Sequence, residues 1–358
     1  MTYIGHSGGG PAMLFPATRA GSEKYLQVHF IRSGGDMTSE RITKIKASKY
    51  FGIILLVALT LLFWGIFKIL SPNNFGTPKL LIGYFQTSIQ YAVGGCGLYF
   101  IVVMGLFDFS VGANIVLSSL VGVLLSRQFG YWGLVVGCLT CGTLIGVFNG
   151  FLYSKLRIPS MIVTVGLMLI LESIANYVVT LDTSGFPGKL TSNDILAFSH
   201  APWNYIVSGT AFFLAFFLLR FTRIGTYCKA IGSNEFVAKN MGINVEKYKF
   251  LGFVILHFFV GIMALLTVSY GRGMLAVTGM SSMDRNFKPL MGTFFGVAFS
   301  KYGYPVTAIV IGEFIITLIF NGLVALNVPT TINDFVTGAV LLIIVTLTNR
   351  GRKGSVVK

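Results

Sequence analysis

Long apolar runs separated by short polar stretches occupy the chain from about residue 50 to residue 348. A run of about 20 apolar residues is long enough to cross a lipid bilayer as a helix. We therefore expect about ten membrane-spanning helices, at 50–70, 80–103, 109–126, 131–153, 159–180, 204–220, 249–271, 287–300, 303–326 and 333–348. The runs near 109 and 287 are short and rich in glycine, which makes them candidates for re-entrant or broken helices. The pattern predicts an all-α polytopic membrane protein.

The same pattern divides the chain into three parts. Residues 50–349 form the predicted membrane domain, 1–49 an N-terminal tail and 350–358 a C-terminal tail. Residues 1–36 have no sustained apolar period, and we expect them to be disordered or a leader. Nothing outside the membrane runs is long enough to form a separate enzymatic domain.

Composition and charge agree with a membrane protein and suggest its orientation. The chain is 54% hydrophobic and 11% charged, whereas soluble domains carry about a quarter charged residues. Its net charge of +15 does not indicate nucleic acid, because the cations lie in the tails and at the edges of apolar runs. An excess of Lys and Arg marks cytoplasmic segments. We expect a membrane protein, surrounded by lipid, with both termini cytoplasmic.

Cysteines carry no chemistry that we can predict. Cys138 and Cys141 spell CxxC, but they lie in an apolar run with no second ligand pair and no histidine nearby. Small buried helix residues are the favoured interpretation. No metal and no disulfide framework is expected.

One polar stretch interrupts the apolar pattern deep in the chain, and we call residues 220–249 the island. It is rich in Lys and Arg, which predicts that it faces the cytoplasm. Asn234 and Glu235 resemble an N-cap followed by an acidic first turn, and Gly242 is a stop signal. A short helix in water is predicted between them.

Polar residues also occur at membrane depth. Asp108, in GLFDFSVG, can accept N–H groups at the start of a helix or contact substrate directly. Ser160 and Thr164 lie one turn apart, where they can serve close helix packing or line a pore. Glu172 and Glu313 either bond to a neighbouring helix or carry protons.

Several of these segments together resemble one known family. TRIG at 222–225, AIGSNE at 230–235 and AKNMGI at 238–243 are similar to the cytoplasmic coupling loop of ribose-type permeases (branched-chain amino acid/simple sugar) of ABC importers. GLFDFSVG at 105–112 and RIPSMIVTVG at 157–166 resemble further signatures of the family. The resemblance weakens from Tyr270 to Tyr304, and Lys229 and Ser233 depart from the family's usual residues.

The resemblance implies a permease subunit that moves a sugar or sugar-like solute by alternating access. Its partners would be a separate ATPase subunit, a second permease copy or paralogue, and an extracellular or periplasmic solute-binding protein. The chain has no phosphate loop, so ATP and Mg would be bound by the ATPase and no cofactor by this chain. The expected ATPase-coupling residues are Arg223, Gly225, Ala230, Gly232, Asn234, Glu235, Ala238, Gly242 and Ile243. The candidates for the translocation path are Phe107, Asp108, Ser110, Asn149, Ser160, Thr164 and Glu172.

Two other functions stay open at this point. An ion-coupled secondary transporter would use Glu172 or Glu313 as the titrating group. A membrane-embedded lipid-modifying enzyme would need a cluster of acids and histidines, and the four histidines do not cluster with acids along the sequence.

Overall fold

The computed structural model describes residues 49–190 and 194–329, with separate positions between 332 and 346. The chain divides into two units, Met1–Phe51 and Gly52–Lys358, and the second unit contains nearly all of the described residues. The predicted tails at 1–49 and 350–358 lie outside the described residues except for Lys49, and most of the span predicted at 333–348 also lies outside them.

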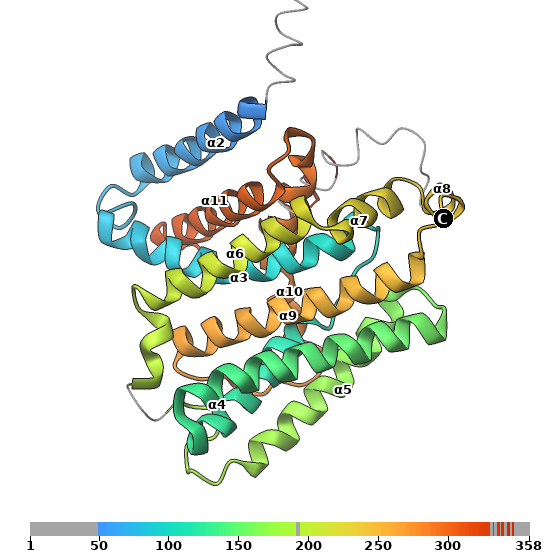
Figure 1. Cartoon of the computed structure of the whole chain (residues 1–358). Helices are drawn as coiled ribbons and strands as arrows, with labels where there is room; N and C mark the ends of the chain where they lie inside the picture. The colour runs from blue at the N-terminus through green and yellow to red at the C-terminus, as the bar shows by residue number, and fades with distance from the viewer. Residues whose placement is uncertain are drawn as a thin grey trace, which may run out of the picture. The chain divides into compact units, whose positions relative to one another are not determined.

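Helices account for the regular structure of the described residues (Figure 1). The α-helices are α2 (Lys49–Leu70), α3 (Pro78–Val103), α4 (Val111–Leu156), α5 (Ser160–Leu181), α6 (Trp203–Phe221), α7 (Arg223–Ser233), α8 (Glu235–Asn240), α9 (Val245–Gly271), α10 (Asp284–Ala298) and α11 (Pro305–Ala325). Three 3-10 helices are η1 (Asp194–Ser199), η2 (Ser281–Met283) and η3 (Ser300–Tyr302). Six of the described helices, namely α2, α4, α5, α6, α9 and α11, are long and apolar enough to cross a membrane. The predicted all-α polytopic fold is confirmed.

α4 contains two of the predicted spans, folded back on each other. Gly130 has φ 56° and ψ −135°, which breaks the helix between a first arm and a second arm. The arms lie against each other, because a Cβ added to Gly137 would lie 2.8 Å from the Cα of Gly122. The spans predicted at 109–126 and 131–153 are therefore the arms of a helical hairpin.

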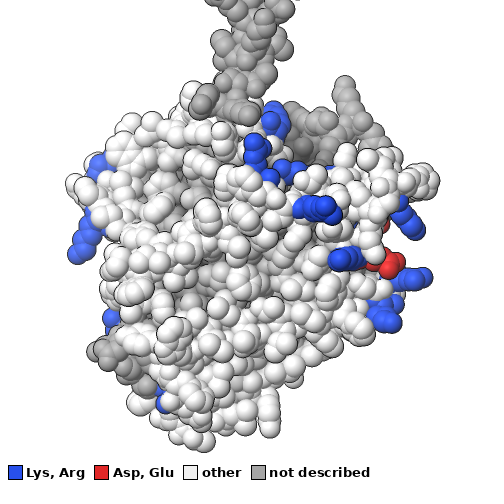
Figure 2. Space-filling model, in the orientation of Figure 1, with Lys and Arg blue, Asp and Glu red and all other residues white. Residues whose placement is uncertain are grey.

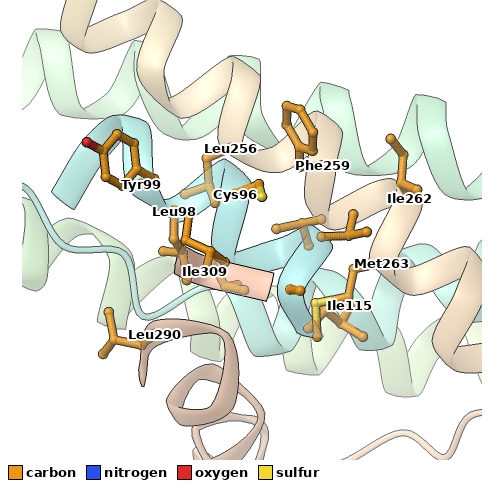
Figure 3. Packing of buried hydrophobic residues seen from close by; sticks show 14 of the residues in the cluster. Cys96, Leu98, Tyr99, Ile115, Leu256, Phe259, Ile262, Met263, Leu290 and Ile309 are labelled. Carbon is orange, nitrogen blue, oxygen red and sulfur yellow. The ribbon is translucent and has the colours of Figure 1, made fainter. Parts of the chain in front are cut away.

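α3 lies in the middle of the core. Its residues from Ala92 to Val103 are all buried, since α3 packs against α9, α10 and α11. Figure 3 shows the contact between these helices, with Cys96, Leu98 and Tyr99 from α3, Leu256, Phe259 and Met263 from α9, Leu290 from α10 and Ile309 from α11. The second half of α3 is apolar on every face, which is the pattern of a helix that its neighbours cover on all sides.

Two segments without α-helix interrupt the bundle, and they meet inside it. We call residues 104–110, between α3 and α4, the first break, and residues 272–283, between α9 and α10, the second break. A Cβ at Gly112 would overlap the carbonyl oxygen of Ser282, so the start of α4 touches the end of the second break. α10 has only 15 residues, as expected for a broken helix near 287.

Candidate functional site

α8 is the short capped helix predicted in the island. Asn234 Oδ1 accepts the backbone N–H of Val237 at 3.0 Å, which is the geometry of an N-cap. After α8 the backbone of Gly242 has φ +83°, a left-handed conformation that favours glycine at a helix end. The start and the end of this helix are both confirmed.

α7 precedes α8 and was not predicted as a separate helix. Its Gly225, Cys228 and Ile231 recur every three residues and are buried, so one face of α7 lies on the bundle. A Cβ at Gly232 would overlap the carbonyl oxygen of Val103, the last residue of α3. The island is therefore in backbone contact with the end of α3.

α8 presents apolar side chains on its outer surface. Phe236 is 73% exposed and Met241 is 75% exposed, and Val237 between them is also exposed. Ala238 is buried and holds the other side of α8 against the protein. Figure 2 shows Lys and Arg side chains gathered around α7 and α8, with a few more at the opposite edge and mostly uncharged surface between them. An exposed apolar patch rimmed by charge marks an interaction site.

A salt bridge and a groove tie α8 to the helix ends behind it. Lys249 Nζ lies 2.8 Å from Glu235 Oε1, which connects α8 to the first turns of α9. Beside this pair is an open groove of about 820 Å³ between α8, the start of α9 and the end of α4. The groove is lined by Tyr153, Ser154, Arg157, Ile158, Pro159, Glu235, Lys239, Ile243, Asn244, Val245, Glu246 and Lys249.

A buried polar network surrounds Asp108 in the first break. Its Oδ1 accepts the backbone N–H of Ser110 at 2.7 Å and the hydroxyl of Ser110 at 2.6 Å. Its Oδ2 accepts from Asn149 Nδ2 at 2.7 Å and lies 2.9 Å from His257 Nε2. Asp108 thus joins the first break to the second arm of α4 and to α9. Four hydrogen-bonding groups thus converge on one buried carboxylate.

The network continues from His257 to the first arm of α4. Asn114 Nδ2 lies 2.6 Å from His257 Nδ1, and Asn114 Oδ1 accepts the hydroxyl of Ser118 at 2.6 Å. Neither Asn114 nor His257 was among the predicted site residues. An ionisable residue within an apolar run was the available signal for His257.

α5 supplies hydroxyl groups that hold the first break. Ser160 Oγ accepts the backbone N–H of Phe107, and Thr164 Oγ1 accepts that of Phe109, each at 3.1 Å. A non-helical segment inside a membrane protein needs such partners for its backbone. The one-turn spacing of Ser160 and Thr164 therefore matches two alternate N–H groups of the break.

α5 also holds the second break, three turns further along. Glu172 accepts the backbone N–H of Ser282 at 2.9 Å and that of Met280 at 3.0 Å. Asn176 Nδ2 donates to the carbonyl oxygen of Val277 at 3.0 Å. One face of α5 thus fixes both breaks.

Asn286, in the first turn of α10, connects the two breaks directly. Its Oδ1 accepts the backbone N–H of Gly112, and its Nδ2 donates to the carbonyl oxygen of Phe109 at 2.6 Å. No pattern in the sequence indicated this role, because Asn286 lies where the family resemblance is weak.

The structure sorts the predicted site residues into two places. Those of the coupling loop lie in or beside α7 and α8, namely Arg223, Gly225, Ala230, Gly232, Asn234, Glu235, Ala238, Gly242 and Ile243. Of the path candidates, Phe107, Asp108, Ser110, Asn149, Ser160 and Thr164 gather at the first break, and Glu172 lies at the second.

Metal and thiol chemistry find no support in the part of the chain that the structure describes. No group of three or more His, Cys, Asp or Glu side chains is placed to hold a metal ion among these residues. The four cysteines are free thiols. Burial raises the pKa of Cys228, in α7, to about 12, so this thiol stays protonated at neutral pH.

Comparison with known proteins gives a family match over most of the chain. The model of the family described as branched-chain amino acid transport system / permease component matches residues 80–345. The ribose import permease protein RbsC of Escherichia coli K12 is 27% identical over 320 residues, covering 82% of this chain and 92% of that protein. The autoinducer 2 import system permease protein LsrC of Yersinia pseudotuberculosis is 28% identical over 305 residues, covering 81% of this chain and 82% of its own length. No solved structure matches the chain.

Proposed function

The chain belongs to the branched-chain amino acid transport system permease family, and from this membership we propose that it is the membrane subunit of an ATP-driven importer for a sugar or sugar-like solute. The relatives named for ribose and autoinducer 2 import support this class of solute. In the proposed cycle a separate ATPase subunit, carrying ATP and Mg, moves two permease subunits between inward and outward opening.

The observation that carries the proposal is the construction of α8. It is a capped helix that presents Phe236 and Met241 to solvent, as expected of a helix that docks into a groove of another subunit. The Glu235–Lys249 salt bridge and the contact of Gly232 with α3 connect it to the bundle. A force applied to α8 would therefore reach the membrane helices.

We assign the remaining partners, a solute-binding protein and a second permease, from the orientation of the bundle in the membrane. We place the island and both termini in the cytoplasm of a bacterial cell, with the chain in the inner membrane, because of the basic residues there. The loop from Asp182 to Pro202 then faces outside, where a solute-binding protein would deliver the substrate. A second permease copy or paralogue would complete the pathway.

Ion coupling is the less favoured function. Both oxygens of Glu172 accept backbone N–H groups of the second break, and Glu313 Oε1 accepts the N–H of Gly292 at 3.1 Å. These hydrogen bonds support structural roles for both acids.

The proposal is tested by purifying the tagged chain from its native cells and identifying what is retained. We expect an ATPase subunit to copurify with the natural chain and to be lost from the double variant Phe236→Glu and Met241→Glu, because each charge replaces an exposed apolar contact. Phe186→Glu, in the loop at the opposite end, also changes an exposed apolar side chain to Glu; it is the matched control and should keep the ATPase. Retention of the ATPase by the double variant, or its absence from the natural chain, would contradict the proposal.

A further inference from the structure

We propose that His257 is a positioning residue that couples the island to the first break, and that it acts as a neutral imidazole donating from Nε2 to Asp108 and accepting at Nδ1 from Asn114. The coupling role rests on the proposed function. The protonation state of the ring does not, and it is tested separately.

The partners of His257 define its protonation. Asn114 Oδ1 accepts the Ser118 hydroxyl, so Asn114 presents its amide nitrogen to Nδ1, and Nδ1 must be an acceptor. Asp108 Oδ2 is an acceptor, so the ring proton is on Nε2, 2.9 Å away. A second ring proton, on Nδ1, would face the N–H of Asn114, so that two donors would repel each other. Because the site is buried, water does not relieve this repulsion.

The surroundings of the ring contain little other charge. His257 is 0% exposed and Asp108 is 5% exposed, and no other charged side chain of the described residues contacts the imidazole. Asn149 Nδ2 lies 3.1 Å from Nε2, while both groups point at the same Asp108 oxygen. From the second arm of α4, the thiol of Cys141 lies beside Ser118. The ring therefore meets one carboxylate and otherwise neutral groups.

Two routes lead from the island to this ring and its carboxylate. The first passes through α7, whose Gly232 lies on the carbonyl of Val103, the residue that precedes the first break and Asp108. The second passes through α9, which begins at Val245 directly after α8 and carries His257 about three turns later. The Asp108–His257 pair is the point where the two routes join.

Close packing makes α9 and the second arm of α4 move together. A Cβ at Gly142 would lie 2.9 Å from the Cα of Gly261, and a Cβ at Gly146 would lie 2.6 Å from the Cβ of His257. The first break touches α9 at Met104, whose Cε would lie 2.6 Å from a Cβ at Gly252, and it meets α9 again where Asp108 contacts His257. Displacement of α8 along α9 is then passed to the break through Met104 and His257.

The ring state is tested on the purified chain with nitrogen-15-labelled histidine, by NMR. Four histidines contribute, and His257→Gln identifies the signal of His257. We expect the signal of a neutral ring that carries its proton on Nε2. In Asn114→Asp the carboxylate faces Nδ1, and the signal should become that of a doubly protonated ring.

The signal of a doubly protonated ring, or of a ring with its proton on Nδ1, would overturn the assignment. This experiment needs only the present chain, so it decides the ring state even if no ATPase is found.

The coupling role is tested in the complex retained by the tagged chain. Phe109→Cys places a thiol in the first break, and its rate of reaction with a maleimide is measured with and without ATP. We expect ATP to change this rate in the otherwise natural complex. The change should persist in His257→Gln, because the Gln side chain also offers a hydrogen-bond donor and an acceptor. In His257→Leu the ATP-dependent change should be lost while ATP hydrolysis continues.

The two possible failures are distinguishable. An unchanged ATP effect in His257→Leu would refute the coupling role of His257 but not the importer function. A natural complex without any ATPase would refute the importer function and leave the NMR result intact. Retention of the ATPase by His257→Leu and His257→Gln alike confirms that both variants are folded.

Discussion

Asp182 stabilises the end of the molecule opposite the island. Arg127, near the tip of the α4 hairpin, donates to Asp182 Oδ2 at 3.2 Å. Partial burial raises the pKa of the Asp182 carboxyl, but hydrogen bonds from Ser184, Arg127 and Gly188 outweigh it and lower the pKa below its ordinary value. The stabilisation is therefore complete above the unfolded-state pKa of about 3.9 and is lost as the pH falls through the lowered pKa.

We predict that Asp182→Asn lowers the free energy of unfolding at neutral pH by about 1.5–3 kcal/mol, the range for hydrogen bonds to a charged group. Thermal unfolding of the detergent-purified protein, compared between natural chain and variant over a series of pH values, measures this difference. The gap between the two melting temperatures should close below about pH 4. A gap that stays constant into strong acid would show that the carboxylate charge is not responsible.

Individual residues of the site differ in how far the sequence alone could predict them. Asn234 could be assigned as a cap because its partner, Val237, lies three residues away. His257 contacts Asp108 across 149 positions of the chain, and nothing local identifies that pairing. Asn286 is similar, since it bonds Phe109 across 177 positions. The residues that were missed are those whose partners come from another helix.

At the scale of single elements, α5 is the helix that holds both breaks. Its predicted boundaries at 159–180 agree with the observed Ser160–Leu181, because Pro159 and the polar residues after Leu181 limit the apolar run. The sequence left open whether Ser160 and Thr164 serve packing or line a pore. In the structure both hydroxyls accept backbone N–H groups of the first break.

We predict that Ser160→Ala and Thr164→Val each destabilise the protein by about 1–3 kcal/mol, because each leaves one backbone N–H of the break without its acceptor. Thermal unfolding in detergent measures the effect. Thr180→Val is the matched control, since Thr180 donates to the carbonyl of Tyr177 within α5 and is exposed. If Thr164→Val and Thr180→Val unfold at the same temperature, α5 does not hold the break in this way.

At the scale of the whole molecule, the apolar runs predicted the order and length of the helices but not how they close on each other. The runs at 109–126 and 131–153 were recognised as two spans, and the hairpin between them depends on the close approach of Gly122 and Gly137. The meeting of the two breaks likewise depends on Gly112 and Asn286, which come from different helices. The period and length of an apolar run predict a helix. Contacts between helices depend instead on the size and shape of the side chains at single positions.

Orientation in the membrane is the property of the whole molecule that the proposed function requires. Of the native thiols, Cys96, Cys138 and Cys228 are buried and Cys141 is half-buried in α4, so an impermeant maleimide should give little background labelling. We predict that Ser184→Cys reacts in intact cells, because its loop faces outside. Lys239→Cys, on α8, should react only after the membrane is permeabilised, since basic segments stay in the cytoplasm.

Both variants change exposed residues, so matched expression is expected and serves as the control for folding. Labelling of Lys239→Cys in intact cells would place α8 outside, away from ATP, and a helix there could not be moved by a cytoplasmic ATPase. The reverse labelling pattern would therefore contradict the importer mechanism while leaving the fold and the Asp108–His257 pair as described.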